Sequence, residues 1–423
     1  MKRLEQIQFG TFLLTVASIA INWMAGFWAT VAFALVSLVR MIVTVCQTKT
    51  LSSLPNPALG PRMRWGLVTM VIYWILILLS MAYTDDSATG WALVSMKASI
   101  LFFPIAFLLT DTSYMTSKHL RVIGNTLVAS LLLVFVYRIG VGIVKVTEGA
   151  TIEEVTGLHF DPRHHAYTAL YLTTALLFIH YELLSHWHSL PKWHRCTLTI
   201  AFPLLIVYVI LVNSRAGMLT LYAIELFVVI HYALTQHNWP KAILLAVLLG
   251  GYTVGMEVVI PGHDNRLSTT IGDLSSDGRL EEYKAGVETW LDSPVIGHGA
   301  GDYRQKLLDR FEKNGFLEGV ENQYNAHNQY IETLLCTGLI GLLVLLIWML
   351  WPTLQAAQMT RKKEGKTKNQ DRNVFWLIVM LTFCVMLGCL FESMLERQMG
   401  LLFIGALTAV MTLVVAGRRG QGD

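Results

Sequence analysis

The chain has 423 residues, of which 54% are hydrophobic and 14% are charged, and its formal net charge is +3. Soluble domains carry about 25% charged residues, so this composition excludes an ordinary soluble domain and indicates a multi-span membrane protein. We expect membrane lipids around the chain and no nucleic acid among its partners.

Apolar runs long enough to cross a membrane follow one another along the chain, since a membrane helix needs roughly 20 mostly apolar residues. The first two runs share one apolar stretch that is interrupted at Asn22 and Trp23. No small-residue cleavage site follows the first run, so we expect a retained membrane helix rather than a signal peptide. The predicted spans are 9–23, 26–46, 65–82, 92–109, 122–144, 166–184, 197–212, 216–234, 242–260, 329–350, 374–391 and 400–416. We therefore predict an all-α integral membrane protein with about twelve transmembrane helices and with both termini on one side of the membrane.

Basic residues are concentrated in the segments predicted to share a side with the N-terminus. The two short loops on the other side, 83–91 and 392–399, hold one basic residue between them, Arg397. By the positive-inside rule, the N-terminus and the basic loop 352–373 then face the cytoplasm. The chain accordingly divides into nine spans in 1–260, a long polar segment outside in 261–328, and three spans in 329–423.

The polar segment 261–328 carries two stretches with apolar residues at helical spacing, 278–291 and 302–311. This spacing predicts two short amphipathic helices over the outer mouth of the bundle, and Asp277 can cap the first of them. The glycines of 297–301 indicate a tight turn between the two helices. A loop of this length inside a compact protein is usually functional.

His327 closes the polar segment and leads directly into an apolar run. Asn325 and Asn328 flank it and could orient its ring or contact a substrate. The start of a membrane helix also presents free backbone N–H groups, which suit an anion. His327 is therefore a candidate catalytic base, and the alternative is a structural histidine at a helix end.

Two arginines are candidates for binding an anionic group. Arg215 lies in a polar break between two apolar runs. An arginine at membrane depth is energetically costly, so its presence indicates a functional role. Its alternative is a snorkelling side chain. Arg279 starts the first expected amphipathic helix, and its alternative is an ion pair with Asp277 or Glu282.

Lys97 and Arg138 lie near the outer ends of their spans and could face a polar cavity. His164 and His165 begin the sixth span and could either meet a substrate or simply solvate the helix end. The five cysteines lie within or beside apolar runs, and neither a disulfide framework nor a metal motif is visible. We therefore expect neither a metal nor a cofactor. Gly338 and Gly341 permit close helix packing.

The order of several motifs resembles the O-antigen ligase and polymerase superfamily of bacterial inner membranes. The resembling features are the Ser214-Arg215 pair between two middle spans, Arg279 and Trp290 in the long loop, the turn Pro294-x-x-Gly297-x-Gly299, and His327-Asn328 before a Gly-Leu-Ile-Gly helix. The resemblance covers the later half of the chain, whereas the first six spans match only in hydropathy.

The resemblance implies an inner-membrane glycosyltransferase whose donor is a glycan on undecaprenyl diphosphate. In the ligases the acceptor is a sugar hydroxyl of lipid A–core, and in the polymerases it is the end of another repeat unit. The family is thought to work without a metal, with a loop histidine and arginines at the positions of His327, Arg215 and Arg279. The chemistry of the histidine suits a base, and that of the two arginines suits a diphosphate clamp. In-line attack at such a site would invert the anomeric centre, and the resemblance implies that it occurs on the periplasmic side.

The sequence favours the ligase branch, and a polymerase is the main alternative. Related ligases that modify proteins are a third possibility. A lipid-linked oligosaccharide flippase belongs to another class, and it would show internal repeats and discontinuous helices in matching positions. No repeat is visible in this chain. The candidate substrate-binding residues are Asn325, Asn328, His164, His165, Arg138 and Lys97.

Overall fold

The computed structural model describes residues 2–49, 56–151, 153–155, 160–161, 163–212, 214–235, 278–361 and 365–419, with the single positions 239, 240, 243 and 247. Within these ranges the chain is helical and has no strand, as predicted. The helices are α1 (Lys2–Ile21), α2 (Trp23–Thr48), α3 (Pro61–Ser80), α4 (Ser87–Lys97), α5 (Phe102–Leu109), α6 (Ser117–Thr147), α7 (His165–His186), α8 (Lys192–Val212), α9 (Arg215–Thr235), α12 (Arg279–Leu291), α13 (Tyr303–Lys313), α14 (Leu317–Glu321), α15 (Gln329–Arg361), α16 (Gly365–Phe391) and α17 (Gln398–Arg419).

Nine helical segments in the described ranges are long and apolar enough to cross a membrane. The predicted spans 166–184 and 216–234 are also helical, but α7 and α9 fall outside this set. Within α9 only Gly217–His231 forms a shorter apolar helix. The predicted span 242–260 lies outside the described residues, so the number twelve stays a prediction.

The division of the first apolar stretch at Asn22 is confirmed. α1 ends at Ile21, and the side chain of Asn22 accepts hydrogen bonds from the backbone N–H groups of Met24 and Ala25 at the start of α2. This is the usual role of an N-cap asparagine, which satisfies N–H groups that have no partner within the helix. The two helices therefore form an antiparallel pair.

The bundle is organised around α7 and α17. The membrane-length part of α17 is entirely buried, and α7 is buried from Ala166 to Glu182 while it packs against α6, α8, α9 and α16. Two polar residues of α7 have charged partners: His180 lies 2.9 Å from Glu225, and Glu182 lies 2.6 Å from Arg121. Burial on all sides lets α7 carry such residues, because its neighbours rather than lipid satisfy them.

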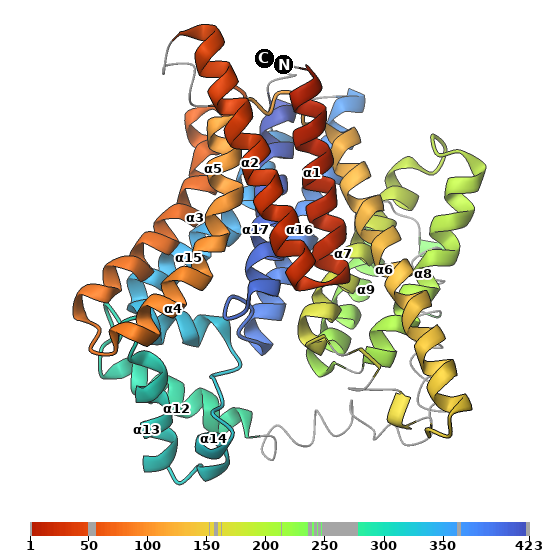
Figure 1. Cartoon of the computed structure of the whole chain (residues 1–423). Helices are drawn as coiled ribbons and strands as arrows, with labels where there is room; N and C mark the ends of the chain where they lie inside the picture. The colour runs from red at the N-terminus through yellow and green to blue at the C-terminus, as the bar shows by residue number, and fades with distance from the viewer. Residues whose placement is uncertain are drawn as a thin grey trace.

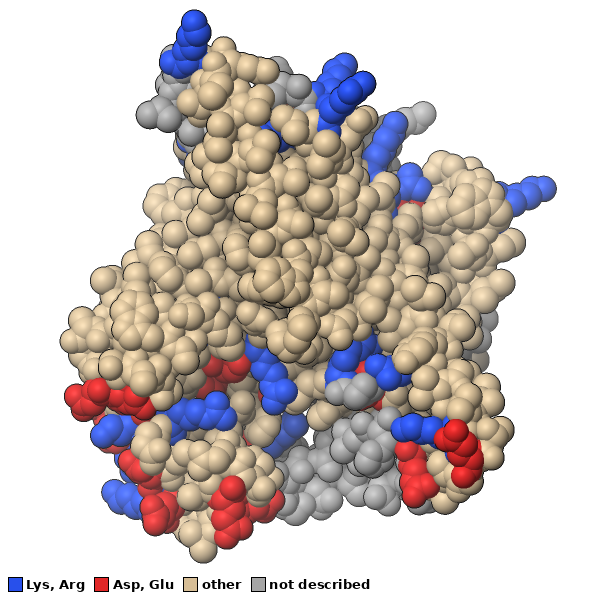
Figure 2. Space-filling view, in the orientation of Figure 1, with Lys and Arg blue, Asp and Glu red and all other residues tan. Residues whose placement is uncertain are grey.

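Both termini lie at one end of the bundle, and α12, α13 and α14 lie at the other (Figure 1). We call these the terminal end and the loop end, and we call residues 278–328 the loop lobe. Figure 2 shows mostly Lys and Arg at the terminal end, a band without charge in the middle, and mixed charges at the loop end. This distribution agrees with the predicted topology, although the side of the membrane that each end faces stays a prediction.

The two predicted short helices are present as α12 and α13, and α14 is an additional short helix. α13 buries its predicted apolar residues, whereas α12 leaves Leu280, Val287 and Leu291 exposed and buries another face. Residue 277 lies outside the described residues, and the N-cap of α12 is Gly278, which has a φ of 69°. The lobe is held to the turn after α3: Tyr83 Oη donates to the Ile296 carbonyl at 2.6 Å, and Asp302 accepts from the N–H of Asp85 at 2.7 Å.

The glycine turn of the loop lobe is inserted into a break in α15. Gly338 has φ 65° and ψ −162°, which interrupts the helix and leaves backbone groups without their usual partners. The turn replaces them. The N–H of His298 donates to the Leu335 carbonyl at 2.8 Å, and the N–H of Leu339 donates to the Pro294 carbonyl at 2.9 Å. Gly338 was predicted as a helix-packing site, and its close contact is with this turn.

Candidate active site

His327 lies in the segment between α14 and α15, next to two asparagines that hold the backbone on either side of it. Its N–H donates to Asn325 Oδ1 at 2.9 Å, and its φ of 40° is in the left-handed region, where few residues other than glycine are found. Asn328 Oδ1 accepts from the N–H of Tyr330 at 2.9 Å and of Ile331 at 3.1 Å, so it caps α15. Asn325 thus holds the backbone of His327 and Asn328 caps the helix that follows, while contact of either asparagine with a substrate stays a prediction.

The ring of His327 is held by a carboxylate from α12. Its Nδ1 lies 2.9 Å from Glu282 Oε2, and the Glu282 side chain is only 3% exposed, whereas that of His327 is 27% exposed. An ionised carboxylate can only accept, so this contact places the proton on Nδ1 and leaves the Nε2 lone pair for another partner. The geometry is that of a histidine base oriented by an acid.

From the sequence, Glu282 was predicted only as a possible ion-pair partner of Arg279. A signal was present, since Glu282 shares the buried stripe of α12 with Ala285, Gly286 and Thr289. A carboxylate on the buried face of a helix needs a partner. Its partner is His327, 45 residues further along the chain.

The pKa of His327 reflects two opposing effects. Burial alone lowers it, because a charged ring is poorly solvated. The hydrogen bond and charge of Glu282, together with the charge of Glu392, outweigh burial and raise the pKa above its ordinary value, although Arg279 acts in the opposite direction. The charge of Arg279 therefore acts on the ring, as expected for a residue one helical turn before Glu282.

His164 and His165 lie at the start of α7, at the same end of the bundle. Their rings stack with centroids 4.7 Å apart, and His164 Nε2 lies 3.9 Å from Glu392. Burial, with the charges of His165, Arg397 and His327, lowers the pKa of His164 to about 3, so this ring is neutral near pH 7. The structure thus brings the predicted His164 and His165 toward His327.

The turn between α16 and α17 contributes two residues that the sequence analysis did not propose as site residues, Glu392 and Arg397. Glu392 is 6% exposed and raises the pKa of His327. Arg397 is exposed immediately before α17, and no hydrogen bond or ion pair joins its side chain to another described residue. Its position beside a helix N-terminus favours an anion.

Arg215 is the first residue of α9, as predicted. Ser214 Oγ accepts from the N–H of Gly217 at 3.2 Å, and a Cβ at Gly217 would lie 2.4 Å from the Cβ of Ala169 on α7. The start of α9 is therefore packed one turn from His165. The side chain of Arg215 lies outside the described part of the structure, so its role stays a prediction.

Lys97 and Arg138 have protein partners. Lys97 is 2% exposed, and its Nζ lies 2.6 Å from Glu396, which also accepts from Tyr303 at 3.0 Å. The side chain of Arg138 lies 3.9 Å from that of Asp161. Their predicted contacts with substrate remain untested. No group of three or more His, Cys, Asp or Glu in the described ranges could hold a metal ion.

Residues 200–346 match the family model described as O-antigen ligase. The matched region runs from α8 into α15 and contains Arg215, Arg279 and His327. It therefore supports the O-antigen ligase superfamily, as the motifs in the sequence predicted. A search of curated proteins found no match to the chain.

Proposed function

We propose that the chain is an integral-membrane glycosyltransferase of the O-antigen ligase type, which moves a glycan from undecaprenyl diphosphate to a sugar hydroxyl of lipid A–core. The observation that carries this proposal is the His327–Glu282 pair, at 2.9 Å, inside the matched family region. Its free Nε2 lies at the loop end of a membrane bundle. We place that end in the periplasm and the bundle in the bacterial inner membrane because of the Lys and Arg asymmetry.

His327 Nε2 takes the proton of the acceptor hydroxyl as its oxygen attacks the anomeric carbon. The new carbon–oxygen bond forms while the bond from that carbon to the diphosphate oxygen breaks, so the diphosphate leaves with the electron pair. Attack from the opposite face inverts the anomeric centre. Glu282 stabilises the imidazolium that forms, and the proton then passes to solvent or to the leaving group.

The leaving diphosphate needs its charge neutralised more than it needs a strong acid. Arg215 and Arg279 are proposed for this role because a guanidinium can bind phosphate oxygens bidentately. Arg279 lies one turn from Glu282, and Arg215 begins a helix packed against the first turns of α7. Two guanidinium groups, each on the first residue of a helix, can replace a metal ion in this role.

The decisive experiment is a reaction of the purified protein with one lipid-linked glycan and two acceptors, lipid A–core and a second repeat unit. Transfer to lipid A–core alone supports a ligase. Transfer to the repeat unit alone supports the alternative, a polymerase of the same superfamily. Transport of the lipid-linked glycan across a vesicle membrane without transfer would reject both in favour of a flippase.

A further inference from the structure

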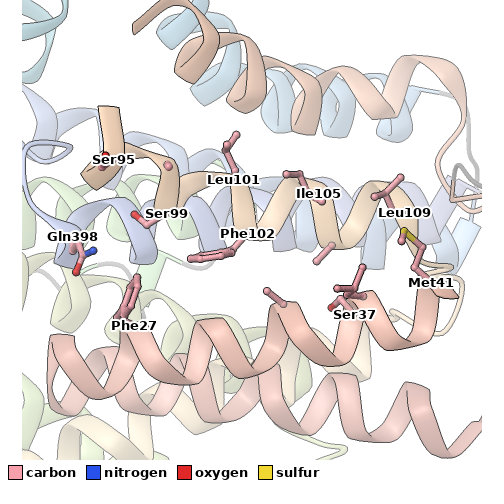
Figure 3. A pocket seen from close by; sticks show the side chains of 14 residues that line it. Phe27, Ser37, Met41, Ser95, Ser99, Leu101, Phe102, Ile105, Leu109 and Gln398 are labelled. Carbon is pink, nitrogen blue, oxygen red and sulfur yellow. The ribbon is translucent and has the colours of Figure 1, made fainter. Parts of the chain in front are cut away.

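A groove of about 450 Å³ lies between α2 and the segment α4–α5, including the 3-10 turn Ala98–Leu101. Figure 3 shows α2 along one wall and this segment along the other, with Phe27 and Gln398 at one end and Met41 and Leu109 at the other. The lining is mainly apolar. Because two of its lining residues, Leu38 and Ile105, are 47% and 46% exposed, the groove opens onto the surface that faces lipid.

The groove leads to the candidate active site. Gln398, at its loop end, is the first residue of α17, and the residue before it is Arg397. Arg397 is exposed and acts on the pKa of His164, whose ring lies beside Glu392. The apolar groove therefore ends next to an arginine that has no ion-pair partner among the described residues.

The dimensions suit one hydrocarbon chain. From Phe27 to Met41, α2 rises about 21 Å at ~1.5 Å per residue, which exceeds the roughly 15 Å depth of one leaflet of hydrocarbon. Spread over that length, 450 Å³ makes a narrow groove in which one hydrocarbon chain can contact both walls at the ~4 Å packing distance between carbon atoms. A phospholipid carries paired acyl chains, whereas a polyisoprenoid lipid carries one.

We propose that this groove holds the part of the donor's polyisoprenoid chain nearest the diphosphate, and that Arg397 binds the diphosphate together with Arg215 and Arg279. The inference rests on the proposed function and locates its substrate. The chain enters sideways from the lipid past Leu38 and Ile105, and its apolar burial contributes affinity along the length of the groove. The guanidinium of Arg397 then holds the phosphate so that the first sugar lies near His327.

Photo-crosslinking tests occupancy without requiring transfer. p-Benzoylphenylalanine is placed at Leu38, which lines the groove, or at Leu35, which is 57% exposed on the same helix and does not line it. The full-length protein, in phospholipid nanodiscs, is given radiolabelled undecaprenyl diphosphate. We expect at least about tenfold more labelling at 38 than at 35, and less labelling when Arg397→Gln is added. Equal labelling at 38 and 35 would overturn the proposal. So would labelling at 38 that excess farnesyl diphosphate displaces as well as excess unlabelled undecaprenyl diphosphate does.

A blocking variant tests the groove in turnover. Ala34 lines the groove, so Ala34→Trp fills it, whereas Leu35→Trp adds bulk on the lipid-facing side. We expect Ala34→Trp to raise the KM for the long-chain donor about tenfold with kcat within a few fold, and Leu35→Trp to change neither. An unchanged KM in Ala34→Trp would contradict the proposed lipid site in the groove and would leave the proposed function standing. Specific labelling at 38 in a protein that never transfers glycan contradicts the proposed function alone.

Discussion

The imidazole of His327 lies 2.9 Å from the carboxylate of Glu282, which is 45 residues earlier in the chain. The pair joins the two ends of the loop lobe, since Glu282 belongs to α12 and His327 lies just before α15. Glu282 is almost fully buried and His327 is partly exposed. The acid is therefore enclosed by protein, whereas the ring keeps an exposed surface.

Replacement of His327 with Ala removes the proposed base. A positioned general base contributes about 100- to 10,000-fold to a rate, whereas the diphosphate leaving group needs no comparable proton donor. We expect His327→Ala to fold, to bind the undecaprenyl-linked donor, and to transfer glycan at least roughly a hundredfold more slowly. Single-turnover rates and donor binding should be measured on the same preparation.

Transfer by His327→Ala within a few fold of wild type would exclude His327 as the base. If the variant instead lost donor binding at unchanged turnover, His327 would be a diphosphate ligand. The search for a base would then move to His164 and His165.

Glu282→Gln should move the pH dependence of transfer to lower pH. A base must be neutral to act, so the wild-type rate falls as the pH drops through the pKa of His327, which lies above its ordinary value of about 6.5. The Gln variant loses the carboxylate that raises this pKa, while the burial that lowers it remains. The acid limb of the kcat–pH profile should therefore move to lower pH, and the maximal rate should also fall.

Glu281→Gln is the matched control, because Glu281 is the preceding residue of α12 and is exposed. Its pH profile should coincide with that of the wild type. An acid limb in Glu282→Gln that stays in place, or that moves to higher pH, would show that Glu282 does not set the protonation of the catalytic group.

Arg215→Lys distinguishes a diphosphate clamp from a snorkelling side chain. Lysine keeps the charge but loses the planar fork that binds two phosphate oxygens. If Arg215 is a clamp, the Lys variant should be nearly as impaired in kcat/KM as Arg215→Ala while retaining the wild-type Tm. Wild-type turnover in Arg215→Lys would mean that Arg215 only snorkels and does not clamp the diphosphate.

Membrane topology can be tested by cysteine labelling in a background without native cysteines. The loop lobe is predicted to face the periplasm and the segment 352–373 to face the cytoplasm. An impermeant thiol reagent applied to intact cells should label Arg310→Cys and leave Lys363→Cys unlabelled. The opposite pattern would place the candidate active site on the wrong side for a lipid-linked periplasmic donor.

The features that the sequence predicted are local. Hydropathy over about 20 residues identified most of the membrane helices, because a helix that crosses lipid must be apolar along its length. Helical spacing located α12 and α13, and in α13 the apolar face that it predicted is the buried one. The partners of His327 and Lys97 were missed. Glu282 and Glu396 lie 45 and 299 residues away from them, and no periodicity reports contacts at that separation.

The break at Gly338 was missed for a different reason. A Gly-Leu-Ile-Gly sequence in an apolar run is also expected where two helices pack closely, so the residue types alone do not distinguish the two structures. Only the positions of Pro294 and Val295 against α15 show that the turn fills the break.

Gly338→Ala should therefore damage the attachment of the loop lobe. A Cβ at Gly338 would lie 2.3 Å from the carbonyl carbon of Val295, and the φ of 65° is strained for any residue with a Cβ. The turn must move or the helix must straighten, and either change withdraws partners from the backbone of His298 and Leu339. We expect a loss of roughly 1–3 kcal/mol in stability, read as a lower Tm in detergent, together with slower transfer.

The control for this variant is Gly140→Ala on α6, where a Cβ would meet nothing within 4 Å. That substitution should leave Tm unchanged or raise it slightly, since alanine favours a helix over glycine by up to ~1 kcal/mol. The effect on transfer separates two interpretations of the break. If Gly338→Ala lowers Tm but transfers at the wild-type rate, the inserted turn only stabilises the fold. If transfer falls further than the unfolded fraction explains, the turn also sets the position of α12, and through Glu282 the orientation of His327.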